Sequence, residues 1–347
     1  MTTSKTPYAI IAPRPGDHTI LRRQAITVPS PKPHELVVKI SAAGVNFIDT
    51  YLRSGVYTTT YPHVIGTEGA GVVQKVGSEA THFSVGDRVT WTAAPGSYAT
   101  HVAVPAANAV RIPDSVDTQT AAALPLQGLT AHYLATSSYP LTPGDIALIH
   151  AGAGGVGLLL THIAQLLGAH VISTVSTANK AELSKQAGAD HVIRYDQYDD
   201  IATELPLAVR KHAADIRAIH GHSYDDGRGE GVSVVYDGVG HSTFEASLAS
   251  LRTRGTLVLF GGSSGQVDPF NLQRLNSGGS LTITRPSLTH FLLTRQELES
   301  RMNDLYAWHA QGKLPITVGA TYPLEQASLA HQALESRATS GKILLIP

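Results

Sequence analysis

The sequence has 347 residues, of which 42% are hydrophobic and 15% are charged, so we expect a compact protein of two domains. A net charge of −1 excludes a strongly basic surface of the kind that attracts nucleic acids or membranes. The absence of cysteine excludes disulfides, cysteine–metal sites and thiol nucleophiles. No apolar stretch of transmembrane length is free of glycine and polar residues, and no apolar signal core begins the chain. We therefore expect a cytoplasmic protein with no membrane contact.

The first part of the chain has the pattern of a β-rich domain. Short alternating runs occur at 35–40, 70–76, 87–91 and 98–104, with glycine and proline between them. The apolar run at 342–346 predicts a last strand that pairs with this domain and makes it discontinuous. The predicted domains are 1–127, 128–288 and a return to the first domain at 289–347.

From about residue 128 the pattern changes to strands that alternate with helices. Strands are predicted at 146–150, 170–175, 191–194, 232–237, 256–260 and 280–284. A helix is predicted at 178–187, ended by Gly188. Six strands in this alternation are typical of a doubly wound parallel sheet, the α/β fold class. The polar segment 220–230 predicts an exposed loop before the fourth strand.

A glycine turn follows the first of these strands. The apolar run 146–149 leads into Gly152-x-Gly154-x-x-Gly157, and an apolar helix follows until Gly168. This succession of strand, glycine turn and helix is what a dinucleotide pyrophosphate requires, because the helix N-terminus offers free N–H groups and a partial positive charge. The alternative is a glycine-rich turn in an unrelated α/β protein.

The end of the second strand indicates which dinucleotide binds. An NAD site places a carboxylate there, but this strand is followed by Ser176-Thr-Ala-Asn-Lys180. Ser176 can donate a hydrogen bond to a 2′-phosphate and Lys180 can pair with its charge, which favours NADPH over NADH. In the alternative interpretation, Ser176 caps the next helix and Lys180 is a solvated surface charge. Both roles are compatible at a helix N-terminus.

Several further motifs follow one another in a fixed order. They are AGVNFIDTYLRSGVY at 43–57, GTEGAGVVQKVG at 66–77, VGDRV at 85–89, AAALPLQGLT at 121–130, AGAGGVG at 151–157, VVYDGVG at 234–240, RPSL at 285–288 and LESRAT at 334–339. From about residue 8 onward, the chain resembles the zinc-independent quinone oxidoreductases of the medium-chain dehydrogenase/reductase superfamily, which include zeta-crystallin. The resemblance implies a GroES-like β-rich catalytic domain, a Rossmann NADPH-binding domain and an active site between them.

The resemblance extends to the zinc alcohol dehydrogenases, but not at their metal ligands. Those enzymes have a histidine where this chain has Thr67, and they use cysteines, which this chain lacks. We therefore expect no catalytic or structural zinc. His220 and His222 with Asp225 and Asp226 form a loose set of potential ligands, for which a solvated loop is the better interpretation.

The resemblance also implies the site residues. The expected catalytic residues are Asn46, Tyr51, Tyr57 and Arg285. The expected cofactor-binding residues are Asn46, Tyr133, Gly154, Gly155, Val156, Gly157, Ser176, Lys180, Tyr195, Gly238, Val239, Phe260, Gly262, Ser263, Ser264, Ser287 and Leu288. Each tyrosine is equally compatible with a packed side chain whose hydroxyl is satisfied. Asp49 either orients its neighbours or stabilises a helix N-terminus.

The function predicted from these residues is NADPH-dependent quinone reduction without a metal. The nearest alternative is reduction of the C=C bond of an enal or enone, which requires the same fold and cofactor. RNA binding, known in some zeta-crystallin-like proteins, is disfavoured by the near-neutral charge and the lack of a basic aromatic stripe. The apolar run 281–284 predicts a sheet edge that pairs with its twin in a homodimer.

Overall fold

The computed structural model describes residues 6–220, 227 and 229–347. The chain divides into two compact units. Unit 1 comprises Met1–Leu129 and Leu292–Pro347, and unit 2 comprises Thr130–Phe291.

Unit 1 is built on two β-sheets. The described residues form a seven-stranded sheet in the order β15-β16-β3-β5-β6-β8, with β7 also paired to β3, and a three-stranded sheet in the order β2-β1-β4. The strands are β1 (Tyr8–Ala12), β2 (Arg22–Ala25), β3 (Glu35–Val45), β4 (His63–Val64), β5 (Gly69–Val76), β6 (Arg88–Trp91), β7 (His101–Pro105), β8 (Ala109–Arg111), β15 (Val318–Pro323) and β16 (Lys342–Ile346).

Alternation along these strands fills the core of unit 1. Leu36, Val38 and Ile40 of β3 point inward and pack in one cluster with Trp91 of β6 and Leu345 of β16. The last strand, β16, pairs antiparallel with β3 and parallel with β15. The prediction that the chain returns at its end to the first sheet is therefore confirmed.

One predicted strand of unit 1 is shorter than expected. The run 98–104 predicted a single strand, whereas β7 begins at His101. Tyr98 and Ala99 turn toward β1 instead, because Ile10 donates its N–H to the Tyr98 carbonyl and Ala9 bridges Ala99. The helices assigned wholly to this unit are α1 (Phe47–Ser54), α2 (Thr118–Ala123), α9 (Arg295–Ala310) and α10 (Ala327–Glu335), and α3 (Pro125–Tyr133) begins in it.

Unit 2 is a six-stranded parallel sheet in the order β11-β10-β9-β12-β13-β14. The strands are β9 (Ile146–Ile149), β10 (His170–Val175), β11 (His191–Arg194), β12 (Val232–Asp237), β13 (Leu251–Leu259) and β14 (Thr282–Thr284). The order reverses between β9 and β12, as in a doubly wound sheet, so the predicted fold class is confirmed. Of these six strands, β13 departs most from its predicted bounds. It begins at Leu251, five residues before the predicted start, and its pairing with β12 has a register shift there.

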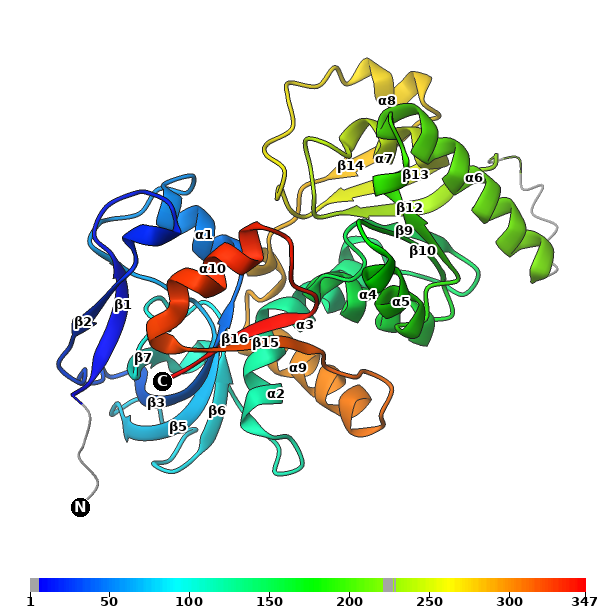
Figure 1. Ribbon diagram of the computed structural model, residues 1–347. Coiled ribbons are helices and arrows are strands. Elements are labelled where there is room, and N and C mark those ends of the chain that lie inside the picture. The colour runs from blue at the N-terminus through cyan, green and yellow to red at the C-terminus, as the bar shows by residue number, and fades with distance from the viewer. Residues whose placement is uncertain (1–5, 221–226, 228) are drawn as a thin grey trace. The chain divides into compact units, whose positions relative to one another are not determined.

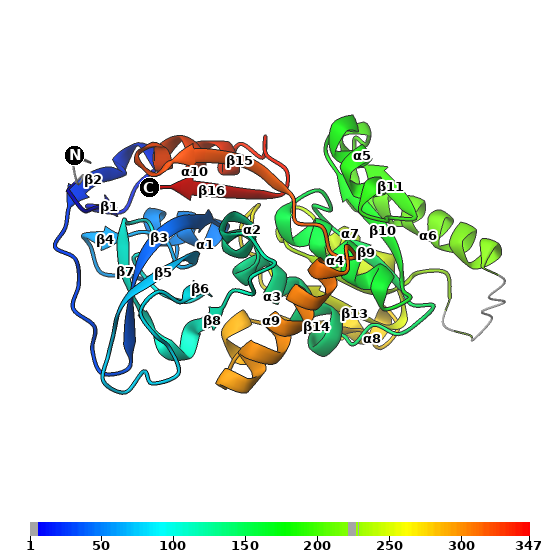
Figure 2. The same cartoon turned by 90° about the horizontal axis from the view of Figure 1, so that it is seen from below.

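Helices cover both faces of this sheet (Figure 1, Figure 2). They are α4 (Gly155–Leu166), α5 (Ala178–Gln186), α6 (Ile201–Ile219), α7 (Phe244–Ser250) and the short α8 (Gln273–Ser277). Leu205, Val209 and Ile216 of α6 pack on Ile172 and Ile193 of the sheet, in the cluster that also contains α7. Most of the predicted loop 220–230, with His222, Asp225 and Asp226, lies outside the described residues. No helix in the described part of the chain is long and apolar enough to cross a membrane.

Candidate active site

The three glycines of the turn in unit 2 have two different roles. A Cβ on Gly152 would lie 1.7 Å from the Ser173 hydroxyl of β10, and one on Gly157 would lie 2.5 Å from the Ala151 carbonyl. These two glycines therefore close the turn against the sheet. Gly154 is the N-cap of α4, and its nearest neighbour would be 3.1 Å away. The least crowded glycine of the turn is thus at the helix N-terminus, where a pyrophosphate would approach the backbone.

Two further turns, after β12 and β13, are interlocked. The Ser264 hydroxyl donates to the Val239 carbonyl at 2.8 Å, and the Ser263 N–H donates to the Gly238 carbonyl at 3.3 Å. The Phe260 ring lies so close to Gly238 that a Cβ there would be 2.8 Å from it. The structure thus brings together most of the expected cofactor residues of these two turns, and Gly262 adjoins them.

A buried polar network supports the turn after β12. The Asp237 carboxylate accepts hydrogen bonds from the Val239 N–H at 2.8 Å and the Ser247 hydroxyl at 2.7 Å. His150 links Ser247 at 3.0 Å to the Thr174 hydroxyl of β10 at 2.9 Å. Burial lowers the pKa of His150, which keeps the imidazole neutral within this network. The network joins the ends of β9, β10 and β12, the strands at the reversal of the sheet.

The residues expected near a 2′-phosphate follow β10 and β11. The N-cap of α5 is Thr177, whose hydroxyl accepts the Lys180 N–H at 3.3 Å. The alternative that Ser176 caps this helix is therefore wrong, and Ser176 directly precedes the cap. Lys180 lies in the first turn of α5, where the helix itself favours an anion. Tyr195 opens a short 3₁₀ helix directly after β11.

The segment after β14 holds Arg285, Ser287 and Leu288, and Tyr133 at the end of α3 packs against it. The Tyr133 ring stacks on Phe291, with centroids 4.4 Å apart and planes at 10°. Tyr133 is buried, which raises the pKa of its hydroxyl, whereas the nearby charge of Arg285 lowers it. Arg285 is exposed, and the Ser287 hydroxyl lies 3.0 Å from that of Thr289. Leu288 begins the 3₁₀ helix that ends at Phe291.

The segments described above follow the six parallel strands β9, β10, β11, β12, β13 and β14, each at the C-terminal end of its strand. They therefore lie along one edge of the sheet, where ligands bind in doubly wound folds.

Asn46 of unit 1 is held by a buried ion pair. It precedes α1, and its Nδ2 donates to Glu68 Oε1 at 2.6 Å, while its Oδ1 accepts from Lys342 Nζ at 2.8 Å. Lys342 and Glu68 form an ion pair in which both side chains are almost fully buried. The other Glu68 oxygen accepts the Leu126 N–H at 2.7 Å. Since an amide nitrogen carries two hydrogens, one donor of Asn46 remains for a ligand.

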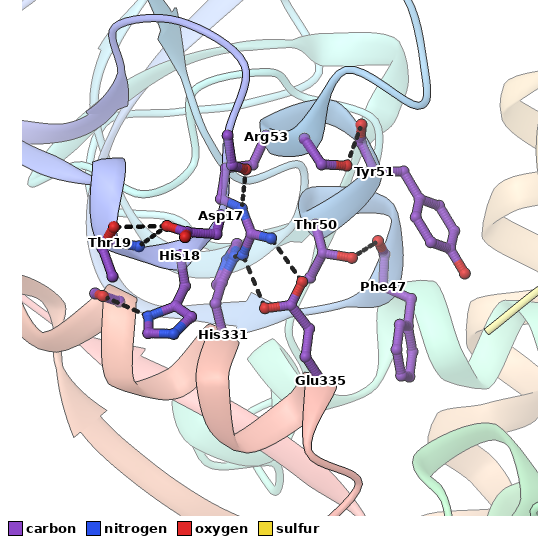
Figure 3. A network of polar contacts seen from close by, with 12 residues as sticks. Asp17, His18, Thr19, Phe47, Thr50, Tyr51, Arg53, His331 and Glu335 are labelled. Atoms are coloured by element: carbon purple, nitrogen blue, oxygen red, sulfur yellow. Dashed lines mark hydrogen bonds and ion pairs between the residues drawn. The ribbon is translucent and has the colours of Figure 1, made fainter. Parts of the chain in front are cut away.

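A chain of hydrogen bonds connects this region to the surface. Arg53 binds Glu335 through two nitrogens and donates to His331 Nδ1 at 3.0 Å. Figure 3 shows these contacts between α1 and α10. Burial lowers the pKa of His331 to about 3, so the ring is neutral and its proton is on Nε2. That nitrogen lies 3.2 Å from the Tyr98 hydroxyl, which donates to Asp49 Oδ2 at 3.1 Å.

The chain ends at Asp49, a fully buried acid. Its Oδ2 also accepts the Asn46 N–H at 2.9 Å, whereas its Oδ1 has no hydrogen-bond partner within the described residues. Burial raises the pKa of Asp49 to about 7, and the negative charge of Glu68 contributes. Both roles considered for Asp49 in the sequence are therefore compatible with the structure. Its side chain orients the Asn46 backbone, and it lies in the first turn of α1.

Three aromatic rings follow Asn46 along the chain and form a row. Phe47 and Tyr51 have ring centroids 6.3 Å apart, and Tyr51 and Tyr57 have centroids 5.4 Å apart. Figure 3 shows the rings of Phe47 and Tyr51 pointing away from the Arg53–Glu335 pair. Tyr57 is 38% exposed, so this row of rings, which we call the aromatic row, is accessible at one end.

The residues at the position of the catalytic zinc in alcohol dehydrogenases do not fit a metal. The Thr67 hydroxyl is a poor zinc ligand, and the neighbouring Glu68 already binds the Lys342 ammonium. A cation placed here would face that ammonium at close range. These residues therefore do not form a zinc site.

Sequence reasoning missed several residues of the buried polar network around Asn46 and Asp49. Lys342, Tyr98, His331 and Glu335 are far from Asn46 along the chain, and no local spacing connects them. The signal present in the sequence was Lys342 itself, a charged residue opening an otherwise apolar last strand.

Comparison with known proteins agrees with this geometry. Residues 32–114 match the alcohol dehydrogenase GroES-like domain, and residues 155–308 match the zinc-binding dehydrogenase family. Quinone oxidoreductase 1 of Escherichia coli (strain K12) is 42% identical over 336 residues, 96% of this chain and 97% of that protein. The chain belongs to the quinone oxidoreductases of the medium-chain dehydrogenase/reductase superfamily.

Two other members extend the comparison. A mycobacterial protein solved in complex with NADPH has a TM-score of 0.89 and 47% identity, and the match covers 99% of this chain and 100% of that one. The 2-haloacrylate reductase of a Burkholderia species is 38% identical over 93% of this chain and 94% of its own length. Members of this quinone oxidoreductase family thus include one described as acting on a C=C substrate.

Proposed function

We propose that this chain is an NADPH-dependent quinone reductase that works without a metal. The observation that supports this most strongly is the set of six turns at the C-terminal edge of the unit 2 sheet, which includes the glycine turn before α4. The relatives named as quinone oxidoreductases, and the similar structure that holds NADPH, support the same cofactor and substrate class.

Different residues of unit 2 bind different parts of the cofactor. Backbone N–H groups at Gly155 and Val156 bind the pyrophosphate at the N-terminus of α4, because the Gly154 N–H already donates to the Ala151 carbonyl at 2.8 Å. Ser176, Lys180 and Tyr195 bind the 2′-phosphate, and the interlocked turns with Gly238 and Phe260 contact the rest of the molecule. When bound, NADPH supplies a hydride from C4 of its nicotinamide.

The residues of unit 1 receive the quinone. The aromatic row of Phe47, Tyr51 and Tyr57 offers flat surfaces to a planar ring, and both tyrosines have hydroxyls that can donate to an oxygen. Asn46 offers its remaining N–H, in an orientation fixed by Glu68 and Lys342. Arg285 is a further donor for an oxygen that becomes anionic. A quinone is electrophilic and gains aromaticity on reduction, so donors of this kind suffice without a Lewis acid.

The test is NADPH oxidation by purified protein with chelator present, with an ortho-quinone, a para-quinone and a simple enal compared and NADH as the control. Rapid turnover of a quinone with NADPH is the expected result. Loss of activity on chelation would contradict the metal-free mechanism, and equal activity with NADH would contradict the 2′-phosphate site.

The second candidate is reduction of a C=C bond conjugated to a carbonyl or carboxylate. The similarity to a 2-haloacrylate reductase favours it specifically. In the same assay, turnover of the enal or of a 2-haloacrylate without turnover of either quinone would assign the chain to this activity.

We further propose a homodimer joined through β14, which is the end strand of the unit 2 sheet and has an unpaired edge within the described residues. Light scattering at several protein concentrations tests this proposal, and a monomer at all of them would contradict it. The cytoplasmic location and the absence of RNA binding stay predictions. Salt-sensitive binding of an RNA that NADPH displaces would contradict the prediction that the protein does not bind RNA.

A further inference from the structure

Two histidines and a carboxylate meet on the face of the unit 2 sheet that α6 covers. His191 begins β11, while His212 and Asp215 lie one turn apart on α6. One ligand atom from each of the three residues lies within 4.8 Å of the other two. The two imidazole rings stack, with centroids 4.3 Å apart and planes at 24°. Strand alternation explains the meeting, because His191 is on the same face as Ile193, which packs against α6.

His212 has a buried nitrogen that the protein does not satisfy. Its Nδ1 makes no hydrogen bond to any residue that the structure describes, and Asp215 Oδ2 lies 3.8 Å away. That distance exceeds hydrogen-bond range, and a buried polar atom without a partner is uncommon and costly. A neutral imidazole nitrogen of this kind has a lone pair to offer to a metal ion.

We propose that His191, His212 and Asp215 form a binding site for a divalent late transition-metal ion, with zinc as the best fit. Two imidazoles and one carboxylate are ligands that zinc accepts, and one water would complete a tetrahedral site. Ligand bonds of about 2.0–2.2 Å require the three side chains to move closer together. All three are partly exposed, so they have room to rotate.

The ion would tie α6 to the edge strand of the sheet. β11 is the last strand on its side and has one neighbour, β10, within the described residues. His191 is at the start of β11, whereas Tyr195 and the cofactor edge follow its end. The site is therefore structural rather than catalytic, and it is independent of the proposed reductase function.

A second group of potential ligands fits a metal less well. His170, Asp190 and His220 also lie within 4.8 Å of one another. However, His170 Nδ1 already lies 3.2 Å from Asp190 Oδ1, and the other Asp190 oxygen accepts the Val171 N–H at 2.7 Å. These atoms have partners that a metal would have to displace, so this group serves as the internal comparison.

The test measures metal binding directly. The full chain is stripped with chelator and titrated with Co²⁺, whose visible absorption reports tetrahedral coordination, and Zn²⁺ then competes for the site. We expect one saturable ion per chain, and we expect His212→Ala and Asp215→Asn each to weaken binding by at least about tenfold. Zinc at about 100 times its Kd should raise the melting temperature of the wild type but not that of His212→Ala.

Two matched controls separate this site from the other histidines. His34→Ala removes an exposed histidine that pairs with Glu79 at 3.0 Å, and His170→Ala disrupts the second group. Both should bind metal like the wild type. Binding that is unchanged in folded His212→Ala, that disappears in His170→Ala, or that does not saturate below about 100 µM would overturn the proposal. Circular dichroism confirms that each variant is folded, and Asp215→Asn, on the surface of α6, tests the site should His212→Ala not fold.

Discussion

The candidate residues of unit 2 and those of unit 1 are built from different materials. In unit 2 the cofactor edge consists of backbone turns, in which Gly152 and Gly157 allow close packing and Gly154 is the least crowded of the three glycines. In unit 1 the site is made of buried charged side chains, among them Glu68, Lys342 and Asp49. The cofactor edge therefore depends on the absence of a side chain at Gly152 and Gly157. The buried cluster of unit 1 depends instead on the Lys342–Glu68 ion pair and on the hydrogen bonds around it.

The largest expected effect comes from breaking the buried ion pair of unit 1. Lys342→Met leaves Glu68 buried and charged without its ammonium, which we expect to lower the free energy of unfolding by about 3–5 kcal/mol. Urea denaturation measures this loss. The double variant with Glu68→Gln should recover part of the loss, because no uncompensated charge then remains.

The control for this prediction is an ion pair at the surface. Arg274→Met breaks the exposed contact of Arg274 with Glu245, which we expect to cost at most about 1 kcal/mol. Equal losses in Lys342→Met and Arg274→Met would show that burial does not distinguish the two pairs.

The pH dependence of Asp49 gives the next largest effect. Burial raises its pKa from 3.8 to about 7, so the folded protein holds this proton more tightly than the unfolded chain does. The contribution to stability is therefore complete below about pH 4 and is lost as the pH rises to about 7. We expect the unfolding free energy of the wild type, relative to Asp49→Asn, to fall by about 2–4 kcal/mol over that range.

Urea denaturation at closely spaced pH values measures this difference. Asp114→Asn, at an exposed position, should show no such trend. A difference that rises with pH would mean that the hydrogen bonds to Asp49 outweigh its burial.

A pair of glycine substitutions tests the corresponding claim for unit 2. Gly157→Ala places a Cβ 2.5 Å from the Ala151 carbonyl, so we expect a loss of about 1–3 kcal/mol in the free energy of unfolding. Gly154→Ala places a Cβ 3.1 Å from the same carbonyl, a milder contact, so we expect a smaller loss of stability together with weaker NADPH binding. Thermal unfolding and NADPH titration measure the two effects. Weakened NADPH binding in Gly157→Ala alone would reverse the roles assigned to these glycines.

The sequence was a good guide to unit 2 because its signals are local. The spacing of Gly152, Gly154 and Gly157, the strand before them and the helix after them all lie within about twenty residues, and the alternation of strands and helices determines the sheet order. Even there, the N-cap of α5 proved to be Thr177 rather than Ser176, since the hydroxyl of either residue suits a cap.

The buried cluster of unit 1 was beyond sequence reasoning for a physical reason. Asn46 meets Lys342, and Tyr98 meets His331, only because β16 returns to pair with β3. The return of the strand was predictable from its apolar pattern. Which side chain faces which depends on register, and a shift of one residue would turn Lys342 to the other face.

The smallest expected effect concerns the 2′-phosphate of the cofactor, which we propose that Lys180 binds. Lys180→Ala should raise the KM for NADPH about tenfold and leave that for NADH unchanged, because only NADPH carries the 2′-phosphate. The matched control is Lys185→Ala, in the last turn of the same helix α5, which should change neither value. Steady-state kinetics with one quinone and both cofactors measures the ratio. Equal loss with NADPH and NADH would place Lys180 elsewhere in the site, and an unchanged ratio would leave the preference for NADPH to Ser176 and Tyr195.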